Sequence, residues 1–211
     1  MTEEQRELYL AGGMSDDERS SFLKEIHEGN LLGFKPSQML LHGPTKRLVD
    51  AYHWHSPDKG IVASYSPKAR DVEDHFGIFR GVDQVEAFAQ ATIVSCATFL
   101  ECRKQNCTPD QLKDKFIPAF ISIGNVNFHY YLEQGDTFIC MGNITFYKWR
   151  QMVCEGRIYR APKGMDLDAY FKDFDEQKLR SFDLDPGFVK IAELYDITGR
   201  GIKKEMFDKL L

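Results

Sequence analysis

Two residues able to exchange protons, His75 and Glu86, lie eleven positions apart near the middle of the chain. Glu86 falls within an apolar stripe that recurs at helical spacing, and a carboxylate on a buried helix face is costly unless it has a partner or a task. His75 precedes it in a loop that contains Gly77 and Gly81. An acid/base pair, formed within one chain or between two, is one interpretation. A solvated or capping glutamate with a structural histidine is the other.

The element that must position Glu86 is an apolar helix. From Ala87 to Leu100, fourteen residues carry no formal charge, which is too few for a bilayer span and enough for about four turns of buried helix. Gly81 marks the start of this helix, with Asp83 in the first turn, where the helix dipole favours an anion. The pattern therefore predicts a helix enclosed by other structure.

Extended segments surround this helix in the sequence. Residues 46–66 carry β-branched and aromatic residues on both sides of a turn with Pro57, Asp58 and Gly60, which predicts a hairpin. After a short connector that opens with Thr108 and Pro109, further strands are predicted at 119–123, 126–132, 137–148 and 151–160. Five or six antiparallel strands around one long buried helix make a hotdog fold, in the α+β class.

The ends of the chain are predicted to be helical. Ser15 begins a capping-box pattern followed by Phe22, Leu23 and Ile26, and Phe188, Ile191 and Leu194 lie at helical spacing. We therefore divide the chain into an N-terminal helical extension over 1–35, a hotdog domain over 36–164 and a C-terminal helical extension over 165–211.

Composition narrows the range of functions. The chain has 211 residues, 43% of them hydrophobic, and a net charge of -5 without any basic run, which gives no electrostatic case for nucleic acid. The first residues are polar and charged and no apolar leader or membrane-length segment is evident. We expect a cytoplasmic protein with no membrane insertion.

Neither a metal nor another cofactor is expected. The five cysteines, an odd number, lack CxxC pairs and an accompanying histidine cluster, so they are predicted to be reduced core thiols. His53 and His55 alternate with Trp54 and would share one strand face at a spacing that a metal site can use. No third ligand is evident nearby, which favours solvent or interface histidines.

Four sequence segments carry a resemblance to a known family. In order along the chain they are LLHGPTKRLVDAYHW, DVEDHF, GVDQVEAFAQA and VNFHYYLEQGD. They are similar to segments of the hotdog-fold 3-hydroxyacyl-(acyl-carrier-protein) dehydratases of bacterial fatty acid synthesis, over about residues 40–160. The loop between His75 and Gly81 departs from the family pattern, since it is about three residues shorter and has no proline. Asp74, rather than glycine, precedes the histidine.

The resemblance implies a mechanism. His75 takes the place of the family's catalytic histidine, Glu86 that of its carboxylate, and Gly81 that of the glycine whose N–H polarises the thioester carbonyl. Elimination of water needs a base, an acid and such a donor. In the family the two side chains come from opposite subunits. The resemblance therefore implies a homodimer, or a higher oligomer of dimers, with the acyl chain in a tunnel.

The expected function is dehydration of a 3-hydroxyacyl thioester to a trans-2-enoyl thioester in fatty acid or polyketide-like biosynthesis. The thioester would be carried on acyl carrier protein, or on CoA, and Arg80, Lys148 and Arg150 are candidates to meet an acidic carrier. Two alternatives stay open: a hotdog acyl thioesterase, and a non-catalytic acyl-binding or partner subunit.

Overall fold

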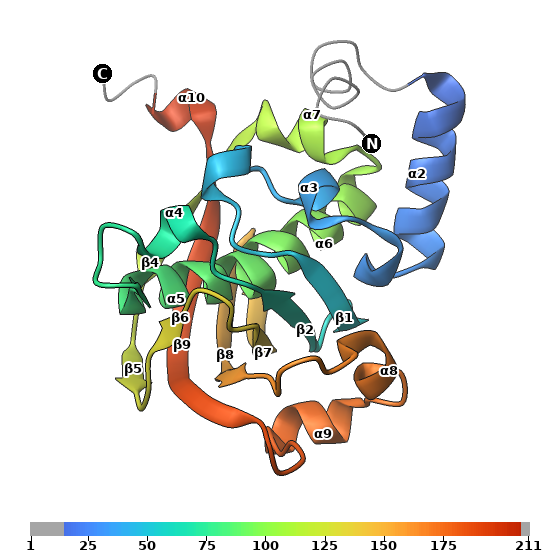
Figure 1. The fold of residues 1–211 in the computed structure, drawn as a ribbon. Helices are drawn as coiled ribbons and strands as arrows, with labels where there is room; N and C mark the ends of the chain where they lie inside the picture. The colour runs from blue at the N-terminus through green and yellow to red at the C-terminus, as the bar shows by residue number, and fades with distance from the viewer. Residues whose placement is uncertain (1–14, 208–211) are drawn as a thin grey trace.

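A computed structural model describes residues 15–207, and its main element is an antiparallel sheet (Figure 1). Within these residues the sheet has seven strands in the order β1-β2-β7-β8-β9-β4, and β5 also pairs with β9. The strands are β1 (Ala51–Ser56), β2 (Gly60–Tyr65), β4 (Phe116–Ser122), β5 (Asn125–Phe128), β7 (Phe138–Lys148), β8 (Gln151–Arg160) and β9 (Val189–Lys203). The predicted hairpin and the four later strands are confirmed to within a few residues at their ends.

One long helix crosses the concave side of this sheet (Figure 1). It consists of α5 (Gly81–Ala89), a π-helical turn η3 (Gln90–Val94) and α6 (Ser95–Gln105). By length and composition Gly81–Gln105 is apolar enough to cross a membrane, but 78% of its most apolar window is buried inside the molecule. That burial is typical of a core helix, and the predicted enclosed helix is confirmed.

Glycines let the helix approach the sheet closely. Gly142 of β7 lies opposite Gly156 of β8 in the strand register. A Cβ atom on Gly142 would lie 2.0 Å from Cγ2 of Thr92, and one on Gly156 would lie 2.5 Å from Cε2 of Phe88. Phe88 and Thr92, both fully buried, therefore occupy the space that side chains on these two strands would take.

Helices from the N-terminal region close the other side of the long helix. The capping box at Ser15 is present and opens α2 (Asp16–Glu28), whose Phe22 and Ile26 enter the core. Shorter helices follow: η1 (Leu31–Gly33), α3 (Pro36–Met39), η2 (Pro44–Lys46) and, after the long helix, α7 (Pro109–Lys113). Residues 1–14 of the predicted extension lie outside the described part of the chain.

The C-terminal region covers the opposite face of the sheet and then joins it. Two helices, α8 (Leu167–Phe171) and α9 (Glu176–Ser181), bury Phe171 and Leu179 against Val62, Ile139 and other residues of the outer face. The helical prediction is wrong for Val189–Lys203, which is the strand β9 between β8 and β4, and residues 208–211 lie outside the described part of the chain. The remaining elements are α4 (Ala69–Val72), α10 (Lys204–Phe207) and a small sheet of β3 (Ile78–Phe79) and β6 (Leu132–Glu133).

The error over β9 has a structural cause. Where β9 pairs with β8, the register shifts between Cys154 and Gly156 and again between Ile158 and Tyr159, each time with an extra residue on β9. One of the inserted positions is near Asp196, which has φ of 53°. Each bulge lengthens the two-residue repeat of a strand to three, so buried residues recur at a spacing that resembles a helix.

Candidate active site

Glu86 lies one turn before the π-helical segment of the long helix. The side-chain amide of Gln90 donates to Glu86 Oε1 at 2.8 Å and to the backbone carbonyl of Lys46 at 2.8 Å, while its oxygen accepts from the N–H of Leu48 at 2.9 Å. Gln90 therefore fixes the Glu86 carboxylate against the chain segment that precedes β1. π-helical turns inside helices often mark functional sites.

A polar cavity of about 500 Å³ opens beside Glu86. His75 borders it, together with charged residues from η2, α4 and the start of α5, so the structure places His75 and Glu86 on one cavity within a single chain. Its lining residues are His42, Thr45, Lys46, Leu48, Arg70, Asp71, Asp74, His75, Phe79, Arg80, Asp83 and Glu86.

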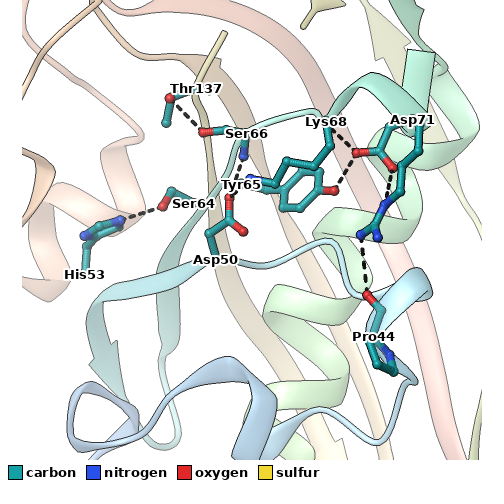
Figure 2. Close-up of polar contacts among 10 residues, drawn as sticks. Pro44, Asp50, His53, Ser64, Tyr65, Ser66, Lys68, Asp71 and Thr137 are labelled. Atoms are coloured by element: carbon teal, nitrogen blue, oxygen red, sulfur yellow. Dashed lines mark hydrogen bonds and ion pairs between the residues drawn. The ribbon is translucent and has the colours of Figure 1, made fainter. Parts of the chain in front are cut away.

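A hydrogen-bond network holds the wall of this cavity (Figure 2). Tyr65 of β2 donates its hydroxyl to Asp71 Oδ2 at 2.6 Å, and the N–H of Lys68 donates to the same oxygen at 2.7 Å. Arg70 donates from Nη2 to the carbonyl of Pro44 at 3.4 Å. These contacts join α4, which leads to His75, to the β2 strand and to the segment that carries His42.

The His75 ring is oriented by a backbone contact. Its Nδ1 lies 3.2 Å from the carbonyl oxygen of Ile78. A carbonyl can only accept, so Nδ1 carries the hydrogen, which leaves a lone pair on Nε2 as long as the ring is neutral. The tight turn after it uses positive φ angles, 56° at Phe76 and 76° at Gly77. His75 is thus presented as a proton acceptor at Nε2.

Gly81 begins α5, as expected, but it does not border the polar cavity. A Cβ atom there would lie 2.9 Å from Cζ of Phe128, so the absence of a side chain allows this ring to approach the helix start. Arg80 pairs with Asp83 through two contacts, Nε–Oδ2 at 2.6 Å and Nη2–Oδ1 at 2.9 Å. That ion pair spans the first turn of the helix, where no side chain of the described residues caps the backbone N–H groups.

Sequence reasoning missed His42 as a site residue. Its Nε2 lies 3.6 Å from Glu86 Oε1, and burial lowers its pKa although the Glu86 charge opposes that shift. The available signal was its place in LLHGPTKRLVD, the segment matched to the family's opening stretch. That segment was used only for the resemblance, and no role was assigned to the histidine in it.

An apolar groove leads from His42 and Glu86 along the long helix. Its volume is about 110 Å³, and it lies between the helix, α7, β4 and β9. Apolar side chains form most of its walls, among them Ala89, Ile93, Val94, Ala97, Leu112, Phe116, Pro118 and Ala119. Arg150 and Arg200 border it near β9. The groove can hold an apolar chain that starts at Glu86.

The prediction that His53 and His55 are solvent or interface residues is wrong, because both are buried in the described chain. They also face opposite ways. His53 contacts Asp168 Oδ1 through Nδ1 at 2.6 Å and Ser64 Oγ through Nε2 at 2.8 Å, whereas His55 accepts from the N–H of Leu31 at 3.1 Å. A register shift between Tyr52 and Trp54 breaks the alternation on which the shared face depended.

The cysteines are free and buried, which confirms the predicted core thiols. Burial raises the pKa of Cys96, Cys102, Cys140 and Cys154, so these groups are protonated and unreactive at neutral pH. Within residues 15–207 no group of three or more histidine, cysteine or acidic side chains is arranged to hold a metal ion.

No protein-family model matches this sequence, and no curated protein matches it. Solved structures do match. The dehydratase heterocomplex ApeI:P from Xenorhabdus doucetiae is similar over 84% of this chain and 97% of its own, with a TM-score of 0.56 and 12% identity. AziG from S. sahachiroi covers 72% of this chain and 90% of its own, with a TM-score of 0.42 and 14% identity.

A mutant acyl-CoA hydrolase from Staphylococcus aureus also matches, over 69% of this chain and 68% of its own, with a TM-score of 0.40 and 12% identity. At identities this low, structural similarity is evidence about the fold and not about the function. The finer resemblance to the fatty acid synthesis dehydratases has no family model behind it. The sheet, the long helix that it encloses and the match to ApeI:P show that this chain has the α+β hotdog fold.

Proposed function

We propose that this chain is a dehydratase that eliminates water from a 3-hydroxyacyl thioester. One observation carries the proposal: an apolar groove and a polar cavity meet beside Glu86. A 3-hydroxyacyl thioester has the same division, with an apolar tail on one side of the reacting carbons and a polar carrier arm on the other. Bound with its tail in the groove, it places those carbons at the carboxylate.

The proposed roles follow the chemistry. His75 removes the proton at C2 through Nε2, and Glu86, in its protonated form, donates to the departing hydroxyl at C3. The electron pair of the broken C–H bond forms the double bond as the C–O bond breaks, which releases water. The N–H of Gly81 is proposed to stabilise negative charge on the thioester oxygen, in the way an oxyanion hole does.

The proposal includes a homodimer. Arg80 and Asp83 border the cavity that holds Glu86 but Gly81 does not, so the Gly81 role is proposed to come from the helix start of a second chain. The exposed apolar side chains of β4 and β5 provide a surface for that second copy. An acidic carrier protein is proposed as the substrate carrier, and it would meet Arg80 at the cavity and Arg150 at the groove, with Lys148 two residues before Arg150 as a further candidate.

The test is an assay of the purified chain with 3-hydroxyacyl thioesters on CoA and on acyl carrier protein. We expect formation of a 2-enoyl thioester, measured by mass spectrometry. Glu86→Gln and His75→Ala should each lower kcat by about 10²–10⁴-fold, because each removes one proton-transfer group. Glu28→Gln, an exposed glutamate on α2, is the matched control and should retain wild-type turnover.

The same assay separates the alternatives. Release of free thiol without enoyl product would show a thioesterase, in which Glu86 would activate water for attack on the carbonyl. Binding of the acyl thioester without any turnover would show a non-catalytic acyl-binding subunit. Wild-type dehydration by both Glu86→Gln and His75→Ala would contradict the proposed roles.

A further inference from the structure

His42 and Glu86 are the two described residues that border both the polar cavity and the apolar groove. The His42 Nε2 atom lies 3.6 Å from Glu86 Oε1, close enough for an ion pair when the ring is protonated. The reacting carbons of a bound thioester would lie at this junction. His42 is therefore close to the proposed proton donor, Glu86, although the sequence-based mechanism assigned it no role.

The surroundings of the ring decide what it can do. Its Nδ1 is buried and has no hydrogen-bond partner within residues 15–207, whereas the side chain as a whole is 23% exposed. Nε2 is the ring nitrogen that faces a titratable group. Burial disfavours the charged ring, so at neutral pH His42 is an uncharged imidazole that gives up a proton readily once it has accepted one.

The chain holds His42 in place relative to Glu86. Gln90 links the Glu86 carboxylate to the backbone of Lys46 and Leu48, and Arg70 donates to the carbonyl of Pro44, two residues after His42. The loop that carries the imidazole is thus attached on one side to the long helix and on the other to α4. Such attachment limits how far the imidazole and the carboxylate can move apart from one turnover to the next.

Other charged groups face the same cavity and are largely occupied with each other. Arg80 pairs with Asp83, and Arg70 lies 3.6 Å from Asp71, which also accepts from Tyr65. The polar cavity is also bordered by Lys46 of η2 and by Asp74 and His75, which follow α4. Three charged residues border the groove: Glu101 from α6, Arg150 from the turn before β8, and Arg200 from β9.

We propose that His42 is the proton-transfer partner of Glu86 and returns to it the proton that each turnover consumes. This role rests on the proposed function. After elimination, the proton from C2 is on His75 and Glu86 is an anion, because its proton has left in the water molecule. His75 releases its proton to solvent, and His42 takes one from solvent in the cavity through Nε2 and passes it to Glu86. Each turnover thus releases one proton to solvent through His75 and takes one from solvent through His42, so no co-reactant other than water is needed.

The experiment uses His42→Ala, which removes the ring and leaves its space. At neutral pH we expect kcat to fall by about ten- to a hundred-fold with KM changed less than about two-fold, since proton return follows substrate binding. Free imidazole at millimolar concentration should occupy that space and raise the kcat of His42→Ala several-fold. It should have no such effect on Glu86→Gln, which has no carboxylate to reload. His27→Gln, an exposed histidine on α2, is the control and should behave as wild type.

A second measurement does not depend on turnover. The His42 ring is titrated by NMR in the wild type and in Glu86→Gln, where we expect the pKa of His42 to fall because the opposing charge is gone. An unchanged titration would show that the two groups are not coupled and would overturn the proposal.

The remaining outcomes separate the two proposals. Turnover by the wild type with a His42→Ala defect that imidazole does not restore, or with no defect, would overturn the role of His42 alone. Absence of dehydration in the wild type would overturn the proposed function and the role that rests on it. Restoration by imidazole supports both.

Discussion

At the scale of single residues, His55 makes the stability of the fold depend on pH. Burial lowers its pKa to about 3, against an ordinary value near 6.5. The unfolded chain therefore binds a proton at this residue between those two values and the folded chain does not. The free energy of unfolding is unaffected above pH 6.5 and falls, as pH drops below it, by about 1.4 kcal/mol per pH unit.

We predict that His55→Gln reduces this slope. The test is urea unfolding, followed by circular dichroism, at several pH values between 6.5 and 5, a range above the ordinary pKa of carboxyl groups. The variant is less stable at pH 7, so the slopes are compared rather than the absolute values. His27→Gln should keep the wild-type slope because that side chain is exposed. Equal slopes in wild type and His55→Gln would contradict the prediction.

Residue placement was predictable from the sequence where a regular period held. Glu86 was placed on the long helix because apolar residues on both sides of it repeat every three to four positions. His53 and His55 were predicted to share one face of the strand, but the register shift between Tyr52 and Trp54 places them on opposite faces. His42 lies beside Glu86 although the two are 44 positions apart, and no local sequence pattern predicts a contact between such distant residues.

At the scale of elements, the long helix was predicted correctly from the sequence, whereas the strand β9 was not. A 25-residue helix contains enough turns for its period to be recognised, and its irregular π-helical segment does not disturb the overall pattern. The strand β9 has two bulges, and each adds one residue to a repeat of two. Because the period itself is altered, β9 was predicted as helix, and the sheet was predicted with five or six strands instead of seven.

The contact between the long helix and β7 can be tested by adding one methyl group. Gly142→Ala places a Cβ atom about where Thr92 Cγ2 lies, with a separation of 2.0 Å. We expect a loss of about 1–3 kcal/mol in the free energy of unfolding, measured by urea denaturation. Adding Thr92→Ser to this variant removes the opposing methyl and should recover part of the loss, since the hydroxyl that donates to the Phe88 carbonyl is kept.

The control for this prediction is Gly43→Ala. A Cβ atom at Gly43 has no neighbour within 4 Å, and its φ of -63° suits any residue. We expect this variant to be as stable as the wild type or slightly more stable. If Thr92→Ser destabilises the protein equally with and without Gly142→Ala, the two sites do not interact and the close approach is not what the glycine provides.

At the scale of the whole molecule, one edge of the sheet is apolar and open. Strands β4 and β5 pair with β9 on one side, and within residues 15–207 no strand lies beyond them. Exposed apolar side chains gather along and after these strands, namely Phe120, Ile121, Ile123, Phe128, Tyr130 and Tyr131. Unpaired strand edges of this kind associate with a further chain unless they are protected.

We predict a dimer of twice the chain's mass in light scattering coupled to size-exclusion chromatography. Replacing Ile121 and Ile123 together by lysine should yield folded monomers, because charged groups on an edge oppose its pairing. Dehydration should be lost with the dimer if two chains complete each site. Leu32→Lys alters an exposed apolar residue on η1 and should leave the dimer intact. A monomeric wild type would contradict this prediction.

The position of β9 also sets the order in which the molecule can be assembled on the ribosome. Both β4 and β5 depend on β9 for their backbone partners, yet they are translated long before it. Until residues 189–203 have emerged, the nascent chain carries two aromatic-rich strands without hydrogen-bond partners and a groove without one of its walls. Contacts this distant in sequence form slowly. A chaperone that shields the incomplete sheet should therefore raise the yield of native protein.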